Sequence, residues 1–134
     1  MIAENEYLIL LVEDDQRVRA GYISLLWMIF DFRKIEAYRI DETDDESRAI
    51  DLIALNKYHL IVLDGRLLPG QHGENVIKAV DPKNHPQILV LSNDVEFVSE
   101  CKELGLSWNF KKSFPYEQGD KPIIFQELKD KLKL

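Results

Sequence analysis

Acidic residues follow two of the most apolar segments of this sequence. Glu13, Asp14 and Asp15 come directly after a run of apolar residues, and Asp64 ends another such run. Carboxylates held within a few ångströms of one another repel, and one is pushed towards protonation unless a cation neutralises it. Hard oxygen ligands suit Mg²⁺, and a carboxylate can also attack a phosphoryl group to form an aspartyl phosphate. The sequence therefore predicts a cation site at which Asp64 is a candidate nucleophile.

A hydroxyl and an ammonium group follow two further apolar segments. Ser92 comes after Ile88–Leu91, and Lys111 and Lys112 come after Trp108–Phe110. Phosphoryl transfer depends on positioning and on neutralising charge on the phosphoryl oxygens. Lys112 can supply a positive charge and Ser92 a hydrogen bond, so both are candidates for the same site.

Each of these residues also has an ordinary structural role. An aspartate that ends a strand is usually a turn former, and Ser92 is suited to cap a following helix. Glu13, Asp14 and Asp15 could be an acidic cluster that the dipole of a helix N-terminus stabilises. We expect Asp15 to be that N-cap and Asp14 to bind a cation. The functional interpretation depends on these groups meeting in one place.

The apolar segments have the length and pattern of strands. Leu8–Val12, Leu60–Leu63 and Ile88–Leu91 are apolar on both faces, as central strands of a helix-covered parallel sheet are. Trp108–Phe110 is a weaker example, and Ile35–Ile40 alternates as an edge strand does. Polar residues at the ends of these segments would then lie at the ends of strands.

Helical patterns lie between the predicted strands. The aromatic and thioether side chains of Trp27, Met28 and Phe30 are expected to pack rather than to bind a cofactor. The inward positions predicted for the first three helices are Val18, Tyr22, Leu25, Leu26 and Ile29; Ile50, Ile53 and Ala54, after a capping box at Thr43–Glu46; and Val76, Ile77 and Val80, from about Gly73. Those predicted for the fourth helix are Phe97, Val98, Cys101 and Leu104, before Gly105, which is expected to end the helix. Those predicted for the last helix, after Pro122, are Ile124, Phe125, Leu128 and Leu132.

The strand–helix order repeats five times, which implies parallel βαβ units. We therefore predict an α/β fold with a doubly wound, five-stranded parallel sheet and helices on both faces. Folds of this kind place their sites at the carboxyl ends of the strands, near the point where the strand order reverses. The acids, the hydroxyl and the ammonium group are then expected to converge on one rim of the sheet.

Length and composition indicate one soluble domain. The 134 residues are 46% hydrophobic, and we expect a single domain over residues 1–134 with its core from about residue 7. The formal net charge of −7 gives no electrostatic footprint for nucleic acid or an anionic membrane.

Cys101 is the only cysteine, which fits a reducing compartment. Leu8–Val12 is too short for a signal peptide or a membrane span, so we expect a cytoplasmic protein.

Four segments, in order, resemble the receiver domain of two-component response regulators. Ile9–Asp15 resembles the first strand with its acidic pair, and Leu60–Asp64 with Leu68–Gly73 resembles the phosphorylation strand and its loop. Leu89–Ser92 resembles the strand that ends in a serine or threonine, and Gly105–Phe114 the glycine-to-lysine segment. Each motif is weak evidence alone, but four motifs in the family's order over nearly the whole chain suggest an atypical, single-domain receiver. The resemblance implies a flavodoxin-like strand order, 2-1-3-4-5.

The resemblance also implies a Mg²⁺ site. Asp14 would bind the ion directly, and Glu13 would help to hold it or its waters. Asp64 would be a further ligand, and so would the backbone carbonyl near Arg66. Mg²⁺ is the one cofactor that the resemblance implies.

The implied function is a phosphorylation-dependent signalling switch. Asp64 would accept a phosphoryl group from a phosphohistidine on a sensor histidine kinase or phosphotransfer protein. Ser92 would hydrogen-bond a phosphoryl oxygen, and Lys112 would pair with Asp64 or its phosphate. The chain would not be an enzyme, and at most it would catalyse its own phosphorylation and dephosphorylation. It would signal by contact with a downstream protein target, without direct nucleic-acid or membrane binding, and whether it forms a homodimer is open.

Departures from the family pattern favour an alternative function. Pro69 follows Asp64 by five residues where the family usually has four, and Asn93 stands where the family prefers a very small residue. Asn109 occupies the position of the usual aromatic switch residue, and Ser113 replaces the usual proline. The residue inserted before Pro69, together with Asn93 and Asn109, favours the alternative, which is a pseudo-receiver, a protein-binding module that signals without phosphorylation.

A third hypothesis is a phosphatase of the haloacid dehalogenase type. The segment from Val62 to Leu67 resembles that family's opening motif. The nucleophile would fall on Val62, whose side chain cannot attack phosphorus, so the sequence disfavours this activity.

Overall fold

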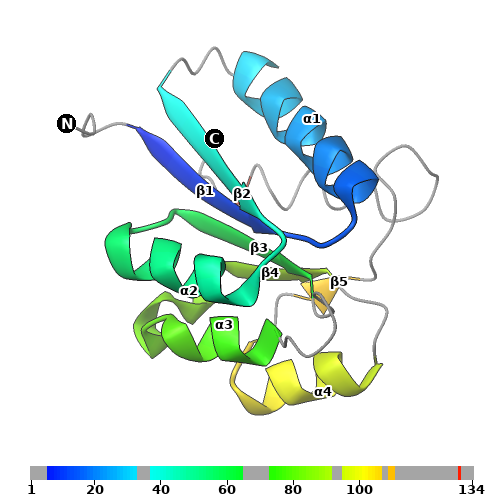
Figure 1. The fold of residues 1–134 in the computed structure, drawn as a ribbon, viewed down its shortest axis with the longest axis vertical. Helices are drawn as coiled ribbons and strands as arrows, with labels where there is room; N and C mark the ends of the chain where they lie inside the picture. The colour runs from blue at the N-terminus through cyan, green and yellow to red at the C-terminus, as the bar shows by residue number, and fades with distance from the viewer. Residues whose placement is uncertain are drawn as a thin grey trace.

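The computed structural model describes residues 6–32, 37–64, 73–91, 95–106, 109–110 and 130, and for some of them, Asp64 included, only the backbone. The chain forms an α/β fold with a parallel sheet in the order β2-β1-β3-β4-β5, which confirms the predicted fold class (Figure 1). The elements are β1 (Tyr7–Val12), α1 (Gln16–Phe32), β2 (Tyr38–Thr43), α2 (Glu46–Leu55), β3 (Leu60–Asp64), α3 (Gly73–Ala79), the 3₁₀ helix η1 (Pro82–Gln87), β4 (Ile88–Leu91), α4 (Val95–Glu103) and β5 (Asn109–Phe110).

Helices cover both faces of the sheet, as predicted. Helix α1 lies on one face, and α2, α3 and α4 lie on the other (Figure 1). Alternate residues of the central strands therefore enter two separate cores. On the α1 side these are Ile9, Leu11, Leu60, Val62 and Leu89; on the other side they are Leu8, Leu10, Val12, Ile61, Leu63, Ile88 and Val90.

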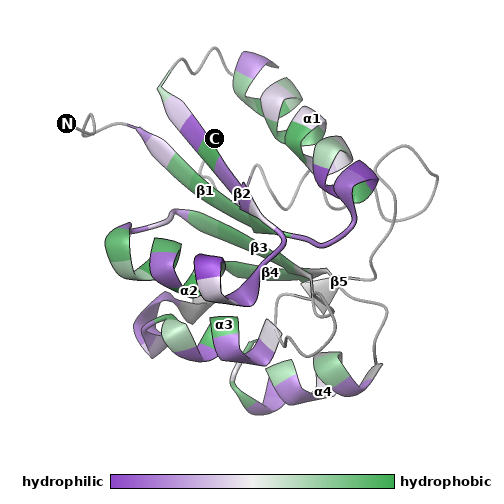
Figure 2. Ribbon diagram, viewed as in Figure 1, coloured by the Kyte–Doolittle hydropathy of each residue, from purple (hydrophilic) through white to green (hydrophobic). Residues whose placement is uncertain are grey.

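The inward faces of two helices agree with their hydrophobic periodicity. In α1 the predicted positions Val18, Tyr22, Leu25, Leu26 and Ile29 are buried. Val76, Ile77 and Val80 are buried at and just beyond α3. Figure 2 shows the same division, with hydrophobic colour along β1 and β3 and hydrophilic stretches on the helices.

The edge strand β2 lies further along the chain than predicted. The prediction was Ile35–Ile40, but the strand is Tyr38–Thr43. Its register pairs Tyr7 with Tyr38 and Val12 with Thr43, which matches the full length of β1. The ring of Tyr38 stacks on Phe30 of α1, with centroids 4.3 Å apart. Apolar alternation was misleading here because an edge strand tolerates polar side chains on both faces.

The predicted capping box before α2 is wrong. Thr43 is the last residue of β2, and its Oγ1 accepts a hydrogen bond from the backbone N–H of Asp45. Asp45 is the N-cap, because its Oδ2 accepts from the N–H of Arg48 at 2.9 Å. The inward face of α2 is consequently formed by Ala49, Leu52 and Ile53, whereas Ala54 is exposed.

Two further burial predictions are wrong. Trp27 and Met28 are 51% and 58% exposed on α1, because they lie beside the inward stripe rather than on it, and only Phe30 of that group is buried. Leu104 is at the surface, while Leu106 is buried. The helix has already ended at Leu104, so helical periodicity no longer describes which side chains face inward.

Gly105 ends α4 as predicted. Its φ of +89° is a left-handed conformation that glycine adopts without strain. The N–H of Gly105 donates to the carbonyl of Lys102, and the N–H of Leu106 donates to that of Cys101. This pair of bonds is a Schellman motif, and it turns the chain so that Leu106 enters the core.

Within the described parts of the chain, no helix has the length and apolar character needed to cross a membrane. The final helix predicted after Pro122 lies outside the described residues, except for Asp130, which is helical.

Candidate functional site

The strand register brings the predicted site segments to one edge of the sheet. Val12 pairs with Leu63, Leu63 with Val90, and Val90 with Asn109. The carboxyl ends of β1, β3, β4 and β5 therefore lie side by side at one rim of the sheet. Glu13 follows β1 there and Asp64 ends β3, whereas Ser92, Lys111 and Lys112, which come next in the sequence after β4 and β5, lie outside the described residues. The strand ends thus meet as predicted, and the convergence of the site side chains on this rim stays a prediction.

The segment Glu13–Asp15, called the acidic loop below, connects β1 to α1. Its three carboxylates have different environments. Glu13 is 2% exposed, and its Oε1 accepts a hydrogen bond from the N–H of Asp15 at 3.1 Å. Asp15 caps α1, because its Oδ1 accepts from the N–H groups of Arg17 and Val18, as predicted. Asp14 is exposed and makes no hydrogen bond or ion pair with the described part of the chain. Asp14 is thus the carboxylate of the loop that is open to a ligand.

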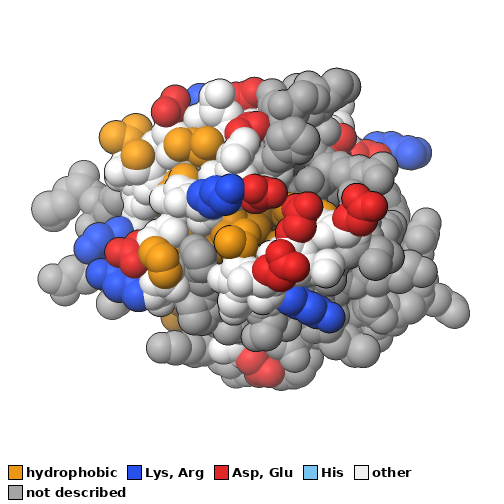
Figure 3. Space-filling view, turned by 90° about the horizontal axis from the view of Figure 1, so that it is seen from below, with side chains coloured by type: hydrophobic (Ala, Val, Ile, Leu, Met, Phe, Trp, Pro, Cys, Tyr) orange, Lys and Arg blue, Asp and Glu red, His pale blue; other side chains and the backbone are white. Residues whose placement is uncertain are grey.

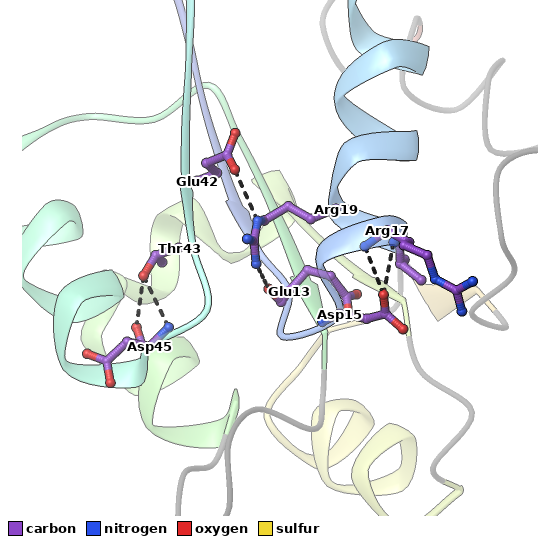
Figure 4. Close-up of polar contacts among 8 residues, drawn as sticks. Glu13, Asp15, Arg17, Arg19, Glu42, Thr43 and Asp45 are labelled. Carbon is purple, nitrogen blue, oxygen red and sulfur yellow. Dashed lines mark hydrogen bonds and ion pairs between the residues drawn. The ribbon is translucent and has the colours of Figure 1, made fainter.

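Arg19 of α1 fixes the acidic loop from the side of β2. Its Nη1 donates to the backbone carbonyl of Glu13 at 2.7 Å, and its Nε lies 3.1 Å from Oε1 of Glu42 (Figure 4). The N–H of Glu13 also donates to the carbonyl of Thr43. The start of the loop is therefore tied to the carboxyl end of β2 by the backbone and by one guanidinium group.

Sequence reasoning missed Arg19 and Glu42. Arg19 lies one helical turn after the cap Asp15, which is a weak signal because many surface arginines share that spacing. Glu42 is 23 residues away in the sequence and reaches Arg19 only because β2 pairs with β1. Such a contact depends on the position of β2, whose bounds the sequence did not predict correctly.

Several predicted site residues lie outside the described residues. These are Arg66, Ser92 and Lys112, and also the side chain of Asp64, whose backbone alone is described. The departures at Pro69, Asn93 and Ser113 lie outside them as well, and for Asn109 only the backbone in β5 is described. Among described side chains, no three Asp, Glu, His or Cys groups lie together as a metal site would require.

A second polar cluster lies at the opposite, amino-terminal edge of the sheet. The hydroxyl of Tyr58 donates to Oδ2 of Asp41 at 2.7 Å, and Arg39 pairs with the same carboxylate and with Asn56. Burial raises the pKa of Tyr58 well above its ordinary value, and the hydrogen bond to Asp41 adds to this effect. A cavity of 490 Å³ opens beside Tyr58, between the ends of α2 and α3. It lies away from the acidic loop, so it is no part of the rim.

The comparisons with known proteins agree on one family. The sequence matches the family model described as response regulator receiver domain over residues 9–124. No curated protein sequence matches the chain.

Similar solved structures include three receiver domains. That of the sensor histidine kinase PA1611 from Pseudomonas aeruginosa PAO1, solved with a magnesium ion in its active-site cleft, is 22% identical, covers 96% of this chain and 99% of that one, and has a TM-score of 0.70. That of the DNA-binding response regulator MerR from Colwellia psychrerythraea 34H is 18% identical over 96% and 99%, with a TM-score of 0.74. The non-phosphorylated HemR receiver from Leptospira biflexa is 25% identical over 96% and 95%, with a TM-score of 0.64.

Residues 9–124 take in every segment of the predicted site, from the acidic loop to Lys112. The strand order is the one that the resemblance to this family implied. The chain therefore belongs to the response regulator receiver domain family.

Proposed function

We propose that this chain is a phosphorylation switch in which Asp64 accepts a phosphoryl group. The observation that supports the proposal is the register in which β3, which ends at Asp64, pairs with β1, which leads into the acidic loop, and with β4. The family supports a phosphorylation-based role in two-component signalling. We infer that it acts as a switch rather than as an enzyme, and that the chain is one receiver domain in the cytoplasm.

The residues of the acidic loop fit a magnesium ion. Asp14 offers an exposed carboxylate, and Glu13 offers a second one that is almost completely buried. Carboxylate oxygens are the ligands that Mg²⁺ prefers, and the ion keeps several waters when protein ligands are few. A receiver of the same fold holds magnesium in its active-site cleft. We infer that Asp14 and Asp64 hold the ion directly, that Glu13 supports it, and that the backbone carbonyl of Arg66 contributes. When bound, the ion would neutralise charge on the phosphoryl oxygens.

The transfer itself needs one bond to break and one to form. The phosphorus–nitrogen bond of a phosphohistidine on the donor breaks, and a phosphorus–oxygen bond to a carboxylate oxygen of Asp64 forms. The donor imidazole keeps the electron pair of the broken bond and takes up a proton from water. Lys112 would balance charge on the phosphoryl group, and Ser92 would donate a hydrogen bond to one of its oxygens. The donor would be a sensor histidine kinase or a phosphotransfer protein.

We infer that the signal passes on through protein contact. A phosphoryl group adds about −1.5 to −2 charge at pH 7, which is enough to bias a bistable surface. The face in Figure 3 carries gathered acidic side chains, with hydrophobic atoms and some Lys and Arg side chains among them. On α4 the exposed Glu96, Glu100 and Glu103 outnumber the one exposed cation, Lys102, among its described side chains. Such a surface repels the phosphates of nucleic acid and favours a protein target with basic residues.

The alternative is a pseudo-receiver that binds its partner without phosphate. Three features of the sequence favour it, namely the residue inserted before Pro69 and the residues Asn93 and Asn109. The two functions differ in whether Asp64 is ever modified.

Intact-mass spectrometry after incubation with Mg²⁺ and acetyl phosphate separates the two functions. We expect one phosphate adduct on the wild-type protein and none on Asp64→Asn. Omission of Mg²⁺ should suppress the adduct, and Asp81→Asn, a change of an exposed aspartate beside η1, serves as the matched control that keeps it. No adduct with acetyl phosphate or with a phosphohistidine donor would support the pseudo-receiver instead.

A further inference from the structure

We propose that Arg19 is a positioning residue that fixes Asp14 for cation binding. The inference rests on the proposed cation site and adds a residue to it that does not touch the cation. Arg19 is on α1, its side chain is 16% exposed, and it contacts the acidic loop through the backbone of Glu13 rather than through a carboxylate.

The planar guanidinium of Arg19 makes two contacts in fixed directions. Nη1 reaches the Glu13 carbonyl at 2.7 Å, and Nε reaches the Glu42 carboxylate at 3.1 Å. The Glu42 side chain is 49% exposed, so this ion pair contributes little stability by itself. Its effect is to orient the guanidinium towards the loop. A lysine at this position would keep the charge but would lack the fork that spans both partners.

The two peptide groups that flank Asp14 are both held. The carbonyl of the Glu13–Asp14 peptide accepts from Arg19, and the N–H of the Asp14–Asp15 peptide donates to the Glu13 carboxylate. The backbone on either side of Asp14 is therefore fixed, while its side chain stays exposed. Loss of the Arg19 contact frees one of these two peptides and leaves Asp14 less well positioned.

Charge and positioning predict opposite effects of changing Arg19. A guanidinium near a cation site repels the cation, so a role through charge alone means that Arg19→Gln tightens Mg²⁺ binding and Arg19→Lys leaves it unchanged. The positioning role means that both variants weaken it. Removing a residue that orients a metal ligand typically weakens metal affinity about 10- to 100-fold, and we expect about 10-fold for each variant.

The matched control is Arg17→Gln. Arg17 lies in the first turn of the same helix and is exposed, and its side chain extends away from the loop (Figure 4). Only its backbone N–H takes part in the cap formed by Asp15. Arg17→Gln removes the same charge near the loop and should leave Mg²⁺ affinity unchanged or slightly tighter.

The experiment is calorimetric titration of the unphosphorylated full chain with MgCl₂, with amide hydrogen exchange at Asp15 as a second measurement. We expect weaker Mg²⁺ binding and faster exchange of the Asp15 amide in Arg19→Lys and Arg19→Gln, but not in Arg17→Gln. Wild-type affinity and wild-type exchange in Arg19→Lys would overturn the positioning role. If the wild-type protein binds no Mg²⁺, the proposed cation site fails, and Arg19 is then judged on exchange alone. Should Arg19→Gln not fold, Arg19→Lys decides the question.

Discussion

Tyr58→Phe tests the polar cluster at the amino-terminal edge of the sheet. The substitution removes only the hydroxyl, which donates to a carboxylate oxygen of Asp41 at 2.7 Å. Hydrogen bonds to charged groups contribute about 1.5–3 kcal/mol. Asp41 keeps its ion pair with Arg39 and stays partly exposed, so the carboxylate is not left buried without a partner. We therefore expect the free energy of unfolding at pH 8 to fall by about 2 kcal/mol.

The same substitution should alter how stability depends on pH. The pKa of Tyr58 is raised in the folded protein, first by burial and then by Asp41, whereas in the unfolded chain a tyrosine titrates near about 10. Above that pH the unfolded chain releases a proton that the folded chain keeps. The contribution of the Tyr58 hydroxyl to the free energy of unfolding is therefore complete below a pH of about 10, and it falls by about 1.4 kcal/mol for each pH unit above that. Phenylalanine has no such proton, so Tyr58→Phe lacks this slope.

Urea denaturation of both proteins at pH 8 and pH 11 measures the effect. The difference in free energy of unfolding should narrow from about 2 kcal/mol at pH 8 to below about 1 kcal/mol at pH 11. The other titrating groups are common to both proteins and cancel in the difference. An equal difference at the two pH values, or no difference at pH 8, would refute the assignment of the Tyr58 hydroxyl to Asp41. A double-mutant cycle with Asp41→Asn isolates the coupling between the two side chains.

Three further predictions follow from the helix ends and the core. Gly105→Ala should lower the free energy of unfolding by about 1 kcal/mol in urea denaturation, since an added Cβ meets no atom within 4 Å and only the positive φ opposes it; an unchanged value would contradict the Schellman motif. Asp45→Ala should cost about 1 kcal/mol through loss of the N-cap, whereas Asp45→Ser should restore most of it. Equal loss in both variants would show that the cap is not the cause. Burial, with smaller contributions from Glu100 and Glu74, raises the pKa of the Cys101 thiol from 9.0 to about 11. A thiol-specific reagent at pH 8 should therefore react with Cys101 only after unfolding, and rapid reaction of the folded protein would show that Cys101 is not in the core.

The central strands and the inward face of α1 could be predicted because burial on both faces leaves a continuous apolar run, and burial on one face leaves a helical period. The edge strand β2 could not be predicted in this way, because it carries the polar residues Asp41 and Glu42, which are stabilised by partners elsewhere in the fold. The capping box before α2 was misassigned for a related reason. Thr43 has the right spacing for an N-cap, but pairing with Val12 keeps it in β2.

The candidate site divides in the same way. Strand ends could be predicted from the sequence, so the pairing of β1, which leads into the acidic loop, with β3, which ends at Asp64, was expected and is present. Of the roles expected for the loop carboxylates, the N-cap role of Asp15 is confirmed, and the cation-binding roles of Glu13 and Asp14 stay predictions. The burial of Glu13 and the link from Arg19 to Glu42 depend on the position of an edge strand far away in sequence. Contacts of that kind require the register before they can be inferred.

The most direct test of the central claim is a crystal structure of the chain with Mg²⁺ and beryllofluoride. We predict one magnesium ion within coordinating distance of both the Asp14 and Asp64 carboxylates, and beryllofluoride on an oxygen of Asp64 with Ser92 and Lys112 beside it. A magnesium ion bound elsewhere, or an Asp64 carboxylate that points away from the acidic loop and carries no beryllofluoride, would contradict the account.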